Sequence, residues 1–244
     1  MVQDAKEVAV KRIAVGYEYL CRIVMMIAVA HIAWLAHTLL GLVVYGLFPS
    51  TAALYGTYRS WLLDVEDRSW TVKRTWITFH RIWVEERNSA NLFGWPQALI
   101  WVLLIWEYWL VQHNDMGVIG IGVSGALLVL NIFYGLFVLL SWAVRANFDE
   151  KPMWVVRTSL SMVVARPLCS LMVVCLFMLT LWAYYTWPGL AVAFGFAVPV
   201  FATMMAVYSW GRMPGMDVHV LEPKDAESSA EHSGKRTVSE AGQK

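Results

Sequence analysis

The residues best placed to do chemistry are polar side chains inside long apolar runs. Glu107 lies in such a run, and an ionisable group in a membrane span usually turns toward a partner or a cavity. It also lies five residues before Gln112, so reaching the outer headgroups is the alternative. His31 and His37 are six residues apart, about 120° around a helix, so they cannot bind one metal ion together. We therefore expect buried, hydrogen-bonded histidines and no haem.

A glycine-rich segment imitates a nucleotide-binding motif. Residues 120–125 read Gly-Ile-Gly-Val-Ser-Gly, which matches the dinucleotide fingerprint. That motif needs a preceding strand and an acidic residue about 20 positions on, whereas here the glycines lie in an apolar run and the next acidic residue is Asp149. Small residues that let membrane helices pack closely explain the segment better. The three cysteines share no metal-ligand spacing. We expect no catalytic residue, no metal and no cofactor, and we favour a protein that is not an enzyme.

These residues belong to apolar segments whose length suits a bilayer. Hydrophobic residues make up 59% of the 244-residue chain and charged residues 15%, against about 25% charged in a soluble domain. Runs of about 20 apolar residues match a hydrocarbon core about 30 Å thick. We predict an all-α, polytopic transmembrane helical bundle with a short sixth span from Pro49 to Leu63. Its five strong spans are 23–48, 92–112, 117–144, 168–186 and 189–210.

The Lys and Arg residues decide how many spans to count, because cytoplasmic loops carry them. They fall in four blocks: before the first span, between Arg59 and the 92–112 span, between the third and fourth strong spans, and after the last. With six crossings all 19 lie on one side, whereas five crossings leave the N-terminal block outside. We predict six crossings and two cytoplasmic termini: a segment 1–22, a membrane domain 23–210 and a largely disordered tail 211–244.

Residues 69–87 are too charged to span a membrane, but four of their apolar side chains recur at steps of four, three and four residues. This spacing places them on one helical face. We predict a helix in the membrane interface whose Lys73, Arg74 and Arg81 contact headgroups or a cytoplasmic partner. A helix that only seals the base of the bundle is the alternative. A second, shorter interfacial candidate covers 153–164.

The sequence resembles a known membrane family at two places. Residues 46–55 read Gly-Leu-Phe-Pro-Ser-Thr-Ala-Ala-Leu-Tyr, and residues 70–91 join a basic, aromatic segment to an asparagine-containing start of the next span. Both are similar to the YesL-like family of bacterial integral membrane proteins, whose biochemical function is unknown. That family usually has a glycine before the proline, where this chain has Phe48. The resemblance implies a multi-pass protein of the bacterial cytoplasmic membrane, often encoded beside sugar transporters, and it supplies no catalytic residue.

Three functions are considered, and the first of them rests on what the family resemblance implies. The first is an accessory component of carbohydrate uptake, in contact with the lipid bilayer and with sugar ABC-transporter subunits. The alternative is a stand-alone small-molecule transporter or membrane sensor, and an intramembrane oxidoreductase is the third. Nucleic acid is not an expected partner, because 19 basic and 18 acidic residues leave a net charge of +1. For the transporter or sensor, the candidate ligand-binding residues are Pro49, Ser50, Thr51, Glu107 and Tyr184.

Overall fold

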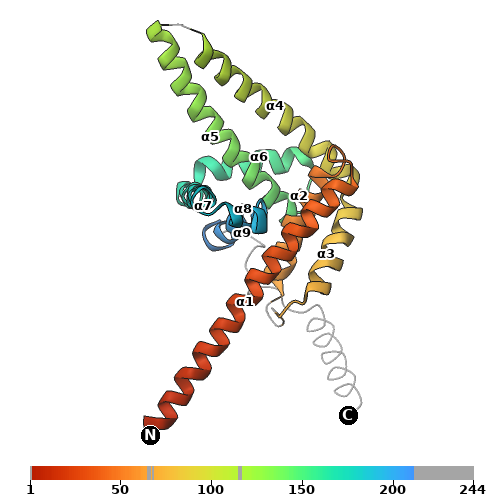
Figure 1. Ribbon diagram of the computed structural model, residues 1–244. Helices are drawn as coiled ribbons and strands as arrows, with labels where there is room; N and C mark the ends of the chain where they lie inside the picture. Colours follow the sequence, from red (N-terminus) through yellow and green to blue (C-terminus); the bar gives the residue numbers. More distant parts are fainter. Residues whose placement is uncertain (1, 65–66, 68, 115–116, 212–244) are drawn as a thin grey trace, which may run out of the picture. The chain divides into compact units, whose positions relative to one another are not determined.

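The computed structural model describes residues 2–64, 67, 69–114 and 117–211. Across these residues the chain forms nine α-helices and no strand, which confirms the all-α prediction (Figure 1). The predicted tail lies, from residue 212 on, outside the described residues. The helices are α1 (Val2–Leu40), α2 (Leu47–Leu63), α3 (Val72–Glu85), α4 (Arg87–His113), α5 (Gly117–Asn147), α6 (Pro152–Ala165), α7 (Pro167–Thr186), α8 (Pro188–Phe194) and α9 (Ala197–Trp210).

Four helices are long and apolar enough to cross a membrane: the Gly16–Leu40 part of α1, and α4, α5 and α7. Helices α8 and α9 pass the same test together, as a pair bent by 73°, which gives a fifth candidate span. The five strong spans are therefore largely helical, although the first ends at Leu40 and the last is broken rather than continuous. The short sixth segment forms α2 but is not a candidate span, so the number of crossings is lower than predicted.

The first apolar run, 23–48, is not one continuous span, because the chain turns back between α1 and α2. In this turn Leu42 and Val43 have positive φ angles of 54° and 62°. Gly41 and Gly46 pack backbone to backbone there, and a Cβ on Gly41 would lie 2.3 Å from the Cα of Gly46. Only glycine permits so close an approach. The reversal thus depends on two small residues that an apolar run does not reveal.

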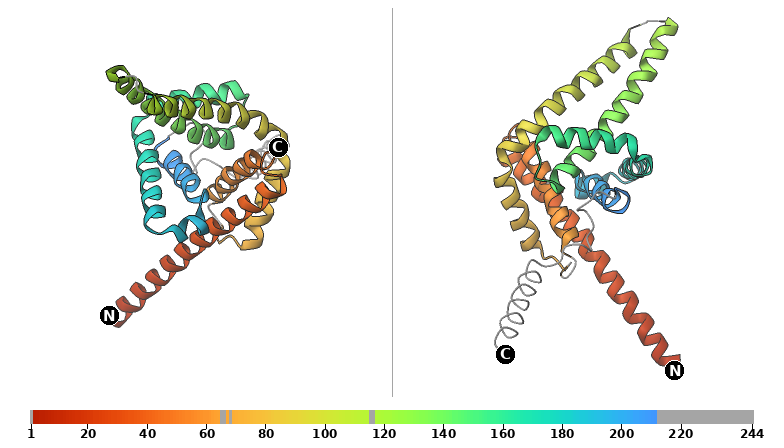
Figure 2. Two further views of the ribbon diagram at one scale, coloured as in Figure 1. Left: turned by 45° about the horizontal axis from the view of Figure 1, so that its top comes forward. Right: turned by 180° about the vertical axis from the view of Figure 1, so that it is seen from behind.

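Helix α2 is the buried centre of the bundle. It contacts α1, α3, α4, α5 and α9, and Figure 2 shows it among them. Tyr55 and Tyr58 are almost fully buried, and their hydroxyls donate to the carbonyls of Leu139 (3.1 Å) and Ala197 (3.2 Å). A helix surrounded by protein does not need to match the thickness of a bilayer, and this explains why α2 has only 17 residues.

Helices α2 and α3 form an antiparallel hairpin, so the residues after α3 lie next to the residues before α2. Gly56 of α2 packs against Ile82 of α3, and beyond α3 the Asn91 side-chain amide donates to the Tyr45 carbonyl at 3.1 Å. The turn before α2 and the start of α4 therefore lie side by side. Six crossings would place these two segments on opposite faces of the membrane, roughly 30 Å apart. The contact thus removes α2 from the count of crossings.

Helix α3 packs its apolar face against protein. Thr71 caps its start by accepting a hydrogen bond from the Arg74 amide at 3.3 Å. Phe79 and Trp83 are buried, with both rings against His37 of α1. The basic side chains of α3 are exposed on its other faces. This helix seals one side of the bundle with its aromatic face and presents a basic surface.

Candidate functional site

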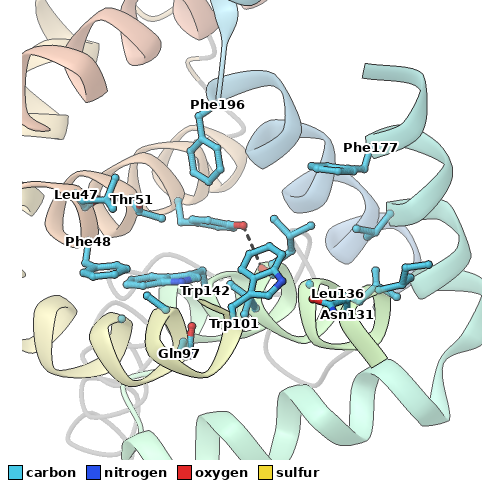
Figure 3. Close-up of a pocket in the computed structure, with 18 of the residues that line it drawn as sticks. Leu47, Phe48, Thr51, Gln97, Trp101, Asn131, Leu136, Trp142, Phe177 and Phe196 are labelled. Carbon is cyan, nitrogen blue, oxygen red and sulfur yellow. Dashed lines mark hydrogen bonds between the residues drawn. The ribbon is translucent and has the colours of Figure 1, made fainter. Parts of the chain in front are cut away.

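A cavity of about 610 Å³ lies between α2, α4, α5 and α7. Trp34 of α1 and Phe196, between α8 and α9, complete its wall. A cavity of this size suits a small organic molecule. Figure 3 shows how side chains from these helices surround it. Those that matter most below are Thr51, Gln97, Trp101, Asn131, Trp142 and Phe177.

Aromatic rings fix one end of the cavity. Phe48 is stacked on Trp142 at 6.2 Å between ring centroids, with 3° between the ring planes. Trp95 meets the edge or face of Phe48 at 5.1 Å, and Phe93 meets Trp142 in the same way at 5.2 Å. Such edge-to-face and stacked pairs hold one another in place. This end of the wall is therefore already ordered before any ligand enters.

Gln97 presents an unused hydrogen-bond acceptor. Its side-chain amide nitrogen donates to the Ser141 hydroxyl at 3.1 Å, while that hydroxyl donates onward to the Val138 carbonyl at 2.8 Å. The Tyr134 hydroxyl donates to the backbone carbonyl of Gln97 at 2.9 Å. The network fixes the orientation of the amide and leaves the buried Oε1 without a partner. An unpaired buried acceptor is costly, so it favours a ligand that carries a donor.

Asn131 repeats this arrangement on the facing helix. Its amide nitrogen donates to the carbonyls of Leu127 (2.9 Å) and Leu104 (3.3 Å), and its buried Oδ1 has no partner. The Thr51 hydroxyl donates to the Leu47 carbonyl at 2.9 Å. Since both amide hydrogens of Asn131 and the hydroxyl hydrogen of Thr51 are already used, this part of the wall offers acceptors to a ligand. It suits an apolar molecule with one or two hydroxyl or amine groups.

The last span breaks where it meets the cavity. Gly195 has a φ of 28°, and a Cβ there would lie 2.3 Å from Cε1 of His31. Its carbonyl accepts a hydrogen bond from the Tyr184 hydroxyl at 2.7 Å. The break brings Phe196 to the cavity wall, where its ring lies 5.4 Å from that of Trp34. Tyr184 therefore supports the wall by holding the break, and does not line the cavity itself.

The predicted ligand-binding residues are only partly brought together. Thr51 lines the cavity, whereas Pro49 and Ser50 are buried in the same turn of α2 without lining it. Glu107 is exposed on α4 and is not part of the wall. Tyr184 contacts the α8–α9 break. A role for these five residues in ligand binding remains a prediction.

Sequence reasoning missed most of the wall. A signal for Gln97 was present, since an amide directly after Pro96 interrupts an apolar stretch. Trp101 and Trp142 could not be separated from the tryptophans that form aromatic belts at membrane surfaces. Only the packing of α4 against α5 shows that both rings face the cavity.

The three predicted basic contact residues lie in different surroundings. Lys73 is exposed on α3. Arg74 is paired within the chain, at 2.5 Å from Asp64 and 2.9 Å from Asp67. Arg81 is exposed and lines a second, polar pocket. Of these three residues, Lys73 and Arg81 have no acidic partner within ion-pair distance among the described residues, whereas Arg74 has two.

The loop before α3 is held by a carboxylate network. Asp67 accepts hydrogen bonds from both the hydroxyl and the amide of Ser69, at 2.5 and 3.0 Å. These bonds, helped by the Arg74 charge, hold the pKa of Asp67 below its ordinary value.

Two histidines from different helices form a pair. His37 lies 2.8 Å through Nδ1 from the Ala33 carbonyl and 3.0 Å through Nε2 from Nδ1 of His80. A carbonyl can only accept, so Nδ1 of His37 carries a proton, and in the neutral tautomer its Nε2 accepts from Nδ1–H of His80. Within the described ranges no three potential metal ligands gather in one group. The contact between the two rings links α1 to α3.

The chain is similar to two proteins of Bacillus subtilis (strain 168). "Uncharacterized protein YteU" is 30% identical over 193 residues, which cover 78% of this chain and 82% of that protein. "Uncharacterized protein YesL" is 24% identical over 160 residues, 66% of this chain and 72% of that protein. Residues 27–108 match the family described as "Protein of unknown function, DUF624". The chain belongs to this YesL-like family.

Within this YesL-like protein the family match runs from α1 through the α2–α3 hairpin into α4. It therefore covers Thr51, Gln97 and Trp101 of the cavity wall, but not the part that α5 and α7 supply. The resemblance seen at 46–55 and 70–91 is confirmed at the level of the family. No solved structure matches the chain.

Proposed function

We propose that the protein binds an apolar or amphipathic small molecule inside the bilayer, as a transporter or membrane sensor. The observation that carries this proposal is the cavity between α2, α4, α5 and α7, with its ordered aromatic end and two unpartnered acceptors. Aromatic surface with a few placed polar groups is typical of small-molecule sites.

The chemistry of the wall narrows the ligand. In a membrane the ligand's alternative surroundings are lipid tails, so apolar contact alone gives little preference for the cavity. Selectivity has to come from shape and from the hydrogen bonds to Gln97 and Asn131. An oligosaccharide would bury many hydroxyl groups, and this wall offers few partners for them. We therefore favour a hydrophobic molecule with a hydroxyl or amine group.

The experiment compares two substitutions of equal size. Ala98→Phe places a ring into the cavity, whereas Ala126→Phe places one on an exposed part of α5. Each protein is purified in mild detergent and its extract is examined by mass spectrometry. We expect one compound to accompany the wild type and Ala126→Phe and to be lost from Ala98→Phe. Three extracts with the same membrane lipids would refute the proposal.

The charges at the ends of α4 and α5 support one orientation of the protein in the membrane. We propose that the ends of α4 and α5 carrying Arg87 and Arg145 face the cytoplasm of a bacterial cell, because cytoplasmic loops collect basic residues. Tyr45 lies at the same end, through its bond to Asn91. With α8 and α9 as one span, the five crossings then put the N-terminus outside and the C-terminus in the cytoplasm. Reporter fusions at each end test this. Two cytoplasmic ends would restore the sixth crossing.

A second function, an accessory role in carbohydrate uptake, is favoured by the surface of α3. Ile77 is 54% exposed beside Lys73, so this helix presents apolar and basic groups together. That combination suits a protein partner or anionic headgroups. In this proposal the partner is a subunit of a sugar ABC transporter.

The accessory role is tested by affinity purification from native bacterial membranes after crosslinking. Lys73→Glu reverses a charge on α3, and Lys151→Glu reverses one before α6 as a control. We expect transporter subunits to accompany the wild type and Lys151→Glu, and to be lost with Lys73→Glu. Recovery of the chain without a transporter subunit, from cells that make the transporter, would contradict the role.

A further inference from the structure

A second pocket, of about 270 Å³, lies where α2, α3 and α5 meet, and its character is opposite to that of the cavity. Four of its lining residues are charged: Arg59, Arg81, Glu86 and Arg145. Three guanidinium groups and one carboxylate leave an excess of two positive charges. Its lining has Trp142 in common with that of the apolar cavity.

The one carboxylate of the pocket is already engaged. Glu86 pairs with Arg145 and accepts a hydrogen bond from the Ser89 hydroxyl at 2.5 Å. Arg145 also donates to that hydroxyl at 3.1 Å. Among the residues that the structure describes, no acidic group lies within ion-pair distance of Arg59 or Arg81. The excess charge therefore belongs to these two residues.

Arg59 is less exposed than Arg81, and not all of its N–H groups have a hydrogen-bond partner. Its buried Nε has no hydrogen-bond partner, although its guanidinium group interacts with the Tyr208 hydroxyl. Arg81 is exposed at the pocket. An unused buried N–H on a cation is expensive unless an anion accepts it.

Close helix packing brings the arginines together. At Gly56 a Cβ would lie 3.1 Å from Ile82, so α2 and α3 touch there. This contact places Arg59, one turn further along α2, beside Arg81 of α3. Arg145 reaches the same pocket from the last turn of α5. Three separate helices thus supply the three guanidinium groups.

The pocket lies where candidate spans end, and the ends of spans meet the lipid headgroups. Two candidate spans end beside it, since α4 begins at Arg87 and α5 ends at Asn147. Trp142 lines both this pocket and the apolar cavity. A lipid with its phosphate at the arginines would therefore have its chains next to the cavity.

We propose that the pocket of Arg59, Arg81 and Arg145 binds a phosphate group. Guanidinium groups match phosphate oxygens through paired N–H donors, and basic pockets between membrane helices bind lipid headgroups. The phosphate belongs either to an anionic phospholipid or to a free phosphate compound. This inference holds whether or not the apolar cavity takes a ligand.

The test uses the full chain in detergent, with two probes. Native mass spectrometry measures retention of phosphatidylglycerol against phosphatidylcholine, and calorimetry measures binding of inorganic phosphate. We expect Arg81→Gln, and Arg59→Gln, to weaken binding about tenfold, as one charged hydrogen bond requires. Arg157→Gln, an exposed arginine of α6, removes the same charge elsewhere and should change nothing.

The two arms separate the sources of phosphate. If the wild type retains phosphatidylglycerol but does not bind inorganic phosphate, and the pocket variants lose the lipid, the ligand is a lipid headgroup. If the wild type binds inorganic phosphate and the pocket variants do not, the ligand is a free phosphate compound. Arg81 is exposed, so its variant should fold even if Arg59→Gln does not. The proposal is overturned if neither probe binds, or if Arg81→Gln binds as tightly as the wild type.

Discussion

The ring of Phe48 lies directly against the backbone of Gly94. A Cβ at Gly94 would be 2.2 Å from Cδ1 of that ring. The contact joins the first turn of α2 to α4 at the edge of the cavity, and it lets Phe48 stack on Trp142. Phe48 directly precedes Pro49, and Gly94 across the interface provides the space for its ring.

We predict that Gly94→Ala destabilises the bundle. Alanine normally favours a helix over glycine by about 1 kcal/mol, but here the added methyl group overlaps a buried ring, at a cost of roughly 1–3 kcal/mol. The melting temperature in detergent should therefore fall.

The matched control for this prediction is Gly122→Ala in α5, where a Cβ meets nothing within 4 Å. This variant should melt at the wild-type temperature or above it. Phe48→Ala should abolish the penalty of Gly94→Ala, because the two changes act at one contact. Equal melting of the two glycine variants would show that the contact is not as close as described.

Replacing Glu86, the carboxylate of the arginine pocket, should strengthen phosphate binding and weaken the fold. Glu86→Gln removes the negative charge next to Arg145, so phosphate should bind roughly tenfold more tightly. The same change weakens the link between α4 and α5 and should lower the free energy of unfolding by about 1–3 kcal/mol. Calorimetry and thermal unfolding measure the two effects. Weaker phosphate binding would contradict the assigned pocket.

The loop before α3 should loosen in acid. The pKa of Asp67 is lowered in the folded protein, so its stabilising bonds to Ser69 and Arg74 are fully present above the ordinary pKa of about 3.9. They are lost as the pH falls through the lowered folded value. Hydrogen exchange at the Ser69 amide should therefore differ between wild type and Asp67→Asn at pH 7.

At a pH below the folded pKa of Asp67 that difference should vanish, since the wild-type carboxyl group is then neutral as well. Ser141→Ala, which lies far along the chain in α5, serves as a control that should leave the loop unchanged. A constant difference across the whole pH range would show that the Asp67 charge does not hold the loop.

The sequence predicts the positions of the helices well, but it predicts less well how they pack against one another. Apolar length locates the strong spans approximately, because the bilayer imposes it, but it shows neither where the first one ends nor where the last one breaks. It does not show that α2 is enclosed by other helices, since a buried helix and a lipid-exposed one are equally apolar. Nor does it reveal the turn at Gly41 and Gly46, whose effect depends on contact between the two glycines.

The cavity wall is harder still to predict, for a physical reason. Gln97 and Asn131 are 34 positions apart, and only the pairing of α4 with α5 places them on one cavity. Thr51 was identified because it lies in the most distinctive part of the sequence. The charge of Glu107 makes it a candidate, but the structure leaves it exposed on the C-terminal part of α4.

Photocrosslinking tests the central claim, a selective ligand cavity inside the bilayer, most directly. A p-benzoylphenylalanine in place of Phe177 would face the cavity, and one in place of Leu179 would lie on the exposed side of the same helix. After irradiation in native membranes, mass spectrometry identifies what each position captures. The cavity predicts a single compound at 177 and a mixture of membrane lipids at 179. The same lipid mixture at both positions would contradict it.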